Sequence, residues 1–133
     1  MSPELKDWKK WEIWYMQAPT FEVEIHHWNH SADFSVWNVY AIIGPKHPRF
    51  RRGSKADDEL PLHGGVTFQG QAYGNSPGRK VGCDYTHYGD KLFQAARTPE
   101  EVPQVFRDAW DLFQFLNLEQ IRGMSPIPNE TDL

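Results

Sequence analysis

The sequence predicts an α+β protein, in which a small antiparallel β-sheet packs against a C-terminal α-helix. Residues 20–28 alternate between apolar and polar side chains, and residues 34–43 (FSVWNVYAII) are rich in β-branched and aromatic side chains. These are the patterns of two half-buried strands. Apolar residues then recur at three- and four-residue steps between residues 98 and 123, which is the spacing of an amphipathic helix.

Length and composition narrow the class of protein. The chain has 133 residues and one cysteine, Cys83. This length suits a single domain over residues 1–123 with a flexible tail at 124–133. A lone cysteine excludes an intramolecular disulfide, and no run approaches the ~20 apolar residues of a membrane span, so we expect a cytoplasmic protein without a membrane partner. The net charge of −4 disfavours binding to extended nucleic acid.

The N-terminal segment favours a short amphipathic helix. Ser2-Pro3-Glu4 has the residue types of a helix start. Leu5, Trp8, Trp11 and Tyr15 follow at helical spacing, and Pro19 ends the segment. A strand over residues 11–16 is an equal alternative.

The middle of the chain reads as two hairpins joined by a long loop. His30-Ser31-Ala32-Asp33 is a turn between the strands at 20–28 and 34–43. Residues 44–65 show no hydrophobic period, and their prolines, glycines and charged residues indicate a loop. Short strands near 66–73 and 80–85 follow, separated by a turn at 74–78.

The C-terminal helix has the clearest start. Thr98-Pro99-Glu100-Glu101 supplies an N-cap, a proline and a capping-box glutamate, although Pro103 can delay the helix by a turn. One apolar stripe follows, formed by Val102, Phe106, Ala109, Trp110, Phe113 and Leu116, and Gly123 ends it. Phe115 and Leu118 lie on the polar face. They indicate either a homo-oligomer contact or ordinary exposed side chains.

Two segments carry residues suited to chemistry. His63-Gly64-Gly65 lets the backbone approach a ligand and offers N–H groups to an anion. Asp84, His87 and Asp90 follow at three-residue steps, a set that can orient an imidazole, bind a metal or accept hydrogen bonds. Each residue also has a purely structural explanation, in turns and caps, which the spacing alone favours.

The same segments resemble a family of small, uncharacterised bacteriophage proteins. Its members carry a Trp- and Tyr-containing strand that runs to a "GHP" corner, an "HGG-(I/L)-T-(Y/F)-x-G" hairpin, a "GFDCAHAGD" segment and a final helix. Here the matching segments are 37–48, 63–70 and 82–90, within a similarity over about residues 36–117. The cysteine is displaced and Arg79-Lys80 replaces two tryptophans, but Asp84, His87 and Asp90 are kept. The resemblance implies a phage origin, the cytoplasm of an infected bacterium and a shared pocket.

The leading hypothesis is a binding protein that sequesters a nucleotide-derived immune signal. Phosphates would be held by backbone amides and arginines, bases by aromatic rings, and hydroxyls or amines by carboxylates. The candidate ligand-binding residues are His63, Gly64, Gly65, Thr67, Asp84, His87, Asp90, Arg49, Arg51, Arg52, Trp37 and Tyr40. We expect no cofactor and no bound metal.

The first alternative is a phosphodiesterase that cleaves such a signal. His63 and His87 are the candidate general acid and base, because imidazole titrates near neutral pH. Asp84 or Asp90 would fix the tautomer of His87. A less favoured version of this enzyme uses His63, Asp84, His87 and Asp90 as ligands of Zn²⁺ or Mn²⁺.

The second alternative is a protein-binding inhibitor of a host defence enzyme. Trp8, Trp11 and Trp14 lie three residues apart in a basic segment. Exposed tryptophans are typical anchors of protein interfaces.

Overall fold

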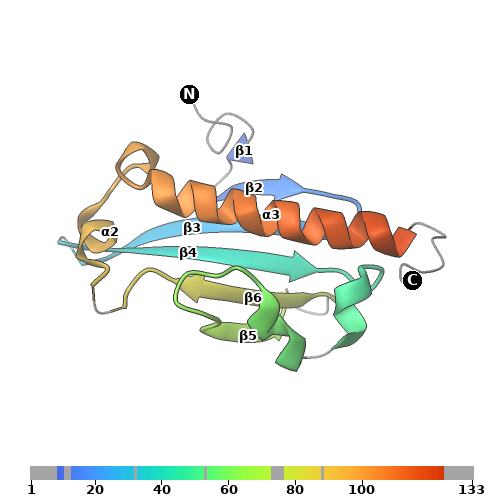
Figure 1. Cartoon of the computed structure of the whole chain (residues 1–133). Helices are drawn as coiled ribbons and strands as arrows, with labels where there is room; N and C mark the ends of the chain where they lie inside the picture. The colour runs from blue at the N-terminus through green and yellow to red at the C-terminus, as the bar shows by residue number, and fades with distance from the viewer. Residues whose placement is uncertain are drawn as a thin grey trace.

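The computed structural model confirms the α+β class. It describes residues 9–10, 13–31, 33–52, 54–72, 77–87 and 89–124. The strands are β1 (Lys9–Lys10), β2 (Trp14–Gln17), β3 (Phe21–Ser31), β4 (Phe34–Ile43), β5 (Phe68–Gln71) and β6 (Arg79–Asp84). They form one antiparallel sheet in the order β1-β2-β3-β4-β6-β5, and helix α3 (Pro103–Met124) lies across one face of it (Figure 1). Of the tail expected at 124–133, Met124 belongs to α3, and residues 125–133 lie outside the described residues.

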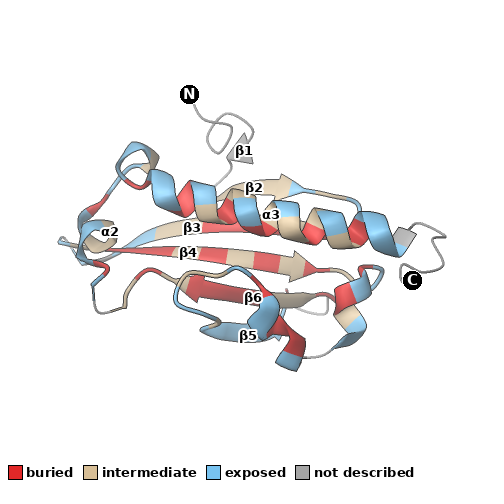
Figure 2. Cartoon of the chain, viewed as in Figure 1, coloured by how far each residue is buried: buried red, intermediate tan, exposed pale blue. Residues whose placement is uncertain are grey.

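The hairpin of β3 and β4 forms the middle of the sheet, as the alternation predicts. The register pairs Phe21 with Ile43 and Ile25 with Val39, with an irregularity between Asn29 and Ser31. Because paired residues share a face, these apolar side chains all point toward α3. Figure 2 shows the buried residues concentrated between the sheet and the helix.

Helix α3 begins one turn later than its capping sequence suggests. The Glu101 carboxylate accepts the backbone N–H groups of Arg97 and Thr98 at 2.7 and 3.0 Å. These residues start a short 3-10 helix, η3 (Pro99–Glu101), and the α-helix starts at Pro103. Val105 and Leu112 join the predicted stripe as fully buried residues.

The N-terminal helix expectation is wrong for the residues that the structure describes, and the alternative of a strand over residues 11–16 is confirmed in part by β2. Residues 9–10 and 14–17 are strands, and β2 pairs with β3 through Trp14 and Ile25. Trp14 packs on the rings of Trp37 and Phe106, with centroids 5.9 and 5.5 Å away. Trp14 is therefore partly buried in the core and does not stand out as an interface anchor. Trp8 and Trp11 lie outside the described residues.

The long segment 44–65 contains two short 3-10 helices, η1 (Pro48–Arg52) and η2 (Ser54–Glu59). Asp57 of η2 is fully buried, accepts a 2.7 Å hydrogen bond from Gln69 of β5, and pairs with Arg79 of β6. The backbone N–H of Leu60 donates to the Asp57 carbonyl, and that of Thr67 donates to the Gly82 carbonyl. The loop between η2 and β5 is thus attached to the sheet at both ends.

Candidate functional site: a carboxylate between two imidazoles

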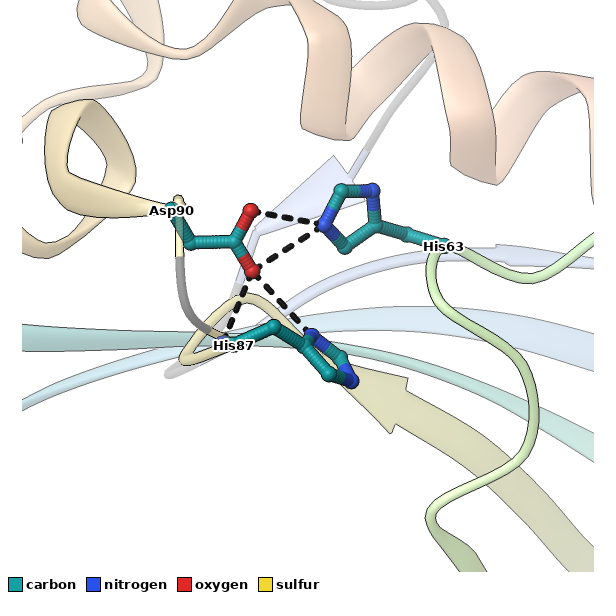
Figure 3. Close-up of side chains that lie close together, drawn as sticks. All are labelled: His63, His87 and Asp90. Carbon is teal, nitrogen blue, oxygen red and sulfur yellow. Dashed lines mark hydrogen bonds and ion pairs between the residues drawn. The ribbon is translucent and has the colours of Figure 1, made fainter.

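Two segments far apart in the sequence meet at one edge of the structure. His63 lies in the loop between η2 and β5, and His87 and Asp90 lie in the turn that follows β6. Figure 3 shows both imidazole rings pointing at the Asp90 carboxylate. The sequence singled out both segments, and the structure brings them together.

Asp90 joins the two histidines. His63 Nε2 lies 2.9 Å from Asp90 Oδ1 and 3.1 Å from Oδ2, and His87 Nδ1 lies 3.1 Å from Oδ2. The backbone N–H of His87 donates to the same Oδ2 at 2.9 Å. Burial by itself raises the pKa of Asp90, but the hydrogen bonds from His87 and His63 outweigh it and hold that pKa below its ordinary value. Asp90 is therefore an anion held among donors.

Backbone geometry fixes the turn that carries His87 and Asp90. Gly89 has φ +101°, and the Asp90 N–H donates to the His87 carbonyl at 2.9 Å. Asp90 also precedes the short helix α2 (Lys91–Ala95), where its carbonyl accepts the N–H of Phe93. Its side chain makes no capping bond there and remains directed at the imidazoles.

Aromatic contacts fix the plane of the His63 imidazole ring. The ring stacks on Tyr85 at 4.3 Å with an interplanar angle of 11°, and Phe93 meets it edge-on at 5.7 Å. Tyr85 is fully buried, and its hydroxyl donates to Asp108 Oδ2 of α3 at 2.6 Å. The orientation of His63 therefore depends on a contact that reaches the helix.

A cleft opens beside His63 along α3. Its volume is about 480 Å³. The lining residues are Leu60, Pro61, Leu62, His63, Gln104, Asp108 and Asp111. Sequence reasoning missed the three helix residues. Their spacing of four and three places them on one helical face, and this was the available signal.

Asp84 and Gly64 lie next to the cluster, whereas, among the described residues, Gly65 and Thr67 make no hydrogen bond to its side chains. Asp84 Oδ1 is 3.7 Å from His87 Nδ1 and accepts hydrogen bonds from the backbone and hydroxyl of Thr86. Gly64 and Gly65 both have positive φ, of 69° and 88°, which favours glycine. Thr67 is exposed at the end of the same loop. Cys83 of β6 is buried in the core, and burial raises the pKa of its thiol to about 12, so that the thiol stays protonated.

Two predicted aromatic contacts lie elsewhere. Trp37 is fully buried in the core and donates its indole N–H to the Ala96 carbonyl at 3.2 Å, so its faces are occupied by protein. Tyr40 lies on the sheet face opposite α3. There its ring contacts Phe68, with centroids 5.7 Å apart, and the Lys80 ammonium, 4.2 Å from its centroid.

The arginine run is not part of the cluster either. Arg49 is 1% exposed, and its guanidinium binds Glu119, Glu59 and the Ala56 carbonyl. Arg52 pairs with Glu59 at 3.0 Å, and Arg51 is exposed. These side chains support the packing of η1 against the C-terminal part of α3. The Arg49 guanidinium is therefore not available to bind a phosphate group at His63 and His87.

Comparisons of the chain with protein-family models, with curated proteins and with solved structures found no significant match. Among the described residues, no helix combines the length and the apolar character needed to cross a bilayer.

Proposed function

We propose that the chain hydrolyses a phosphoester bond in a small nucleotide-derived molecule, and that the reaction takes place at His63, His87 and Asp90. The observation that carries this proposal is the Asp90 carboxylate, which binds imidazoles from two separate segments at 2.9 and 3.1 Å. A carboxylate that orients an imidazole is a recurrent part of hydrolytic sites. Here one carboxylate orients two.

The two imidazoles are partly exposed, whereas the carboxylate that holds them is buried. The side chains of His63 and His87 are 28% and 35% exposed, against 8% for Asp90. Within the described residues, His63 Nδ1 and His87 Nε2 make no hydrogen bond. These nitrogens are available to take a proton from water or to give one to a leaving group.

The position of the arginines favours hydrolysis over sequestration. Tight sequestration of a phosphate ligand relies on pre-arranged cationic donors. Arg49 is committed to Glu119 and Glu59, and three carboxylates, of Asp84, Asp90 and Asp108, lie near the histidines instead. A negatively charged surface of this kind binds phosphate only weakly unless a positive charge is supplied at the histidines and Asp90 themselves.

The ligand class rests on the chemistry of the cleft. Gln104, Asp108 and Asp111 offer acceptors that suit the hydroxyls of a ribose or the exocyclic amine of a base. The segments that carry the likeness to phage proteins, 63–70 and 82–90, are also the ones that meet at the cluster. The acceptors of the cleft support a nucleotide-derived substrate, and the resemblance supports a pocket shared with those proteins.

Incubation with a panel of cyclic mono- and dinucleotides tests the proposal. The protein is then heat-denatured, and the filtrate is analysed by mass spectrometry. We expect a linear or shortened nucleotide, with turnover reduced by about 100-fold or more in His63→Gln and His87→Gln. The matched control is His26→Gln, because His26 is also paired with a carboxylate, Glu24, at 2.8 Å.

The recovered molecule separates the alternatives. Release of the intact nucleotide after depletion from solution would support sequestration and overturn hydrolysis. A panel that is neither depleted nor cleaved would overturn both and favour a protein partner.

A further inference from the structure

We propose that His63, His87 and Asp90 together bind one divalent transition-metal ion of the zinc or manganese class. This inference rests on the proposed function and deepens it. The ion would supply the positive charge and activate the water, and His63 and His87 would then act as its ligands in place of a general acid and base. The inference can also hold when the proposed reaction does not, because ion binding is measured without a substrate.

The donor atoms are already close enough to share an ion. One nitrogen from each histidine and one Asp90 oxygen all lie within 4.8 Å of one another. Zinc bonds to such ligands measure about 2.0–2.2 Å, so neighbouring ligand atoms lie roughly 3–3.5 Å apart. The distances of 2.9 to 3.1 Å between the imidazole nitrogens and Asp90 need only a small expansion.

The donor set selects the class of ion. Two imidazoles and one carboxylate suit Zn²⁺, Mn²⁺ and Fe²⁺, whereas Mg²⁺ and Ca²⁺ prefer all-oxygen sites. Three protein ligands leave a coordination position for water. With Zn²⁺ in the site, a bound water would ionise near neutral pH and could then attack a phosphoester.

The three side chains are held in place by their surroundings. Asp90 is 5% exposed and fixed by the His87 N–H, while the stack on Tyr85 sets the plane of His63. Figure 3 shows that the two rings approach the carboxylate from different sides. Ligands that converge before an ion arrives lose little conformational freedom when they bind it.

The charge balance favours a cation. Among the described residues, no lysine or arginine forms an ion pair with Asp84, Asp90 or Asp108. Asp84 Oδ1 is 3.7 Å from His87 Nδ1, and it adds negative charge beside the cluster. A divalent ion offsets these carboxylates and gives a phosphate group a positive partner.

Titration of the metal-free full-length protein with Zn²⁺ in a calorimeter tests the inference. Chelator is used to strip the protein and is then removed. We expect one ion per chain in the wild type and in His26→Gln, and affinity weaker by more than about 100-fold in His63→Gln and His87→Gln, since even outer-sphere partners contribute 10- to 100-fold. Co²⁺ provides a second readout, because its visible spectrum reports nitrogen and oxygen ligands.

Folding of each variant is checked by circular dichroism, and the wild type supplies a test that needs no variant. Zn²⁺ is expected to raise its melting temperature, and chelator to reverse the rise. Absence of binding by the wild type, or equal affinity in His63→Gln and His26→Gln, would overturn the metal site.

Substrate assays with and without the ion distinguish the two proposals. Zinc binding without turnover of any nucleotide retains the metal site and rejects hydrolysis. Turnover that persists in chelator, by a protein that binds no ion, retains hydrolysis and rejects the metal site.

Discussion

The backbone of Gly64 lies directly against the imidazole of His87. A Cβ atom added to Gly64 would be 2.7 Å from His87 Cε1, whereas one added to Gly65 would meet no atom within 4 Å. The first glycine of the pair therefore leaves room for a site residue, and the second serves only the turn.

Alanine substitutions at Gly64 and Gly65 distinguish a glycine that makes room for His87 from one that only forms the turn. Both glycines have positive φ, so each substitution should cost about 1–2 kcal/mol of folding free energy. Gly64→Ala should also displace His87 and weaken zinc binding and turnover, whereas Gly65→Ala should leave them near wild type. Urea unfolding and zinc titration measure both effects. Equal loss of zinc binding in the two variants would contradict this explanation.

Arg49 should be a stability residue rather than a ligand-binding one. The buried guanidinium of Arg49 binds Glu119 and the Ala56 carbonyl, so Arg49→Ala removes these charge-assisted hydrogen bonds and should cost about 1.5–3 kcal/mol, because the remaining carboxylates are partly exposed. The neighbouring exposed Arg51 is the control, and Arg51→Ala should change stability by less than about 0.5 kcal/mol. Thermal and urea unfolding test this directly. Reduced nucleotide binding by Arg51→Ala at unchanged stability would restore a ligand role to the arginine run.

Glu22 should make stability depend on pH near neutrality. Burial and a hydrogen bond with Glu24 raise its pKa from 4.5 to about 7. The folded protein therefore keeps a proton that the unfolded chain releases, and this contribution is complete below about pH 4.5 and is lost as the pH rises through 7.

Glu22→Gln should remove that dependence. At pH 8 the variant should be more stable than the wild type by ~1 kcal/mol, a value reduced from the full shift because Glu22 is partly exposed. At pH 4 the two should agree closely. Urea unfolding across pH 4–8 provides the comparison, and a constant difference between the curves would exclude Glu22 as the titrating group.

The Tyr85 hydroxyl should matter for folding more than for the site. Tyr85→Phe keeps the ring that stacks on His63 but removes the 2.6 Å hydrogen bond to Asp108, at a cost of about 1–3 kcal/mol. Gln104→Ala removes the exposed hydrogen bond to the same carboxylate and should cost less than about 0.5 kcal/mol. Zinc affinity should stay within a few-fold in both. A large loss of affinity in Tyr85→Phe would make the hydroxyl part of the site.

Local periodicity predicts the parts of the fold that depend on local contacts. The alternation around Val23 and the stripe around Phe106 each appear where the structure places a strand and a helix. The helix predicted for the N-terminal segment is wrong because Trp14 and Met16 pair with β3, and Trp14 also packs against Phe106 of α3. Pairing with a neighbouring strand leaves little trace in the local spacing of tryptophans.

The candidate site was predictable in its parts but not in its surroundings. His63, His87 and Asp90 stand out because glycines and regular spacing accompany them. Their meeting depends on contacts across 27 residues, which spacing does not reveal. Arg49 shows the same limit, since its partner Glu119 is 70 residues away and nothing near Arg49 indicates that it is buried.

The two-ended attachment of the loop between η2 and β5 has a consequence for the speed of recognition. Asp57 anchors one end to Gln69 and Arg79, and Thr67 bonds Gly82 at the other. The conformational entropy of this loop is therefore lost during folding, before a ligand binds. Ligand binding should then follow a single kinetic phase. Its observed rate constant should increase linearly with ligand concentration, because no slow rearrangement of the loop limits the rate.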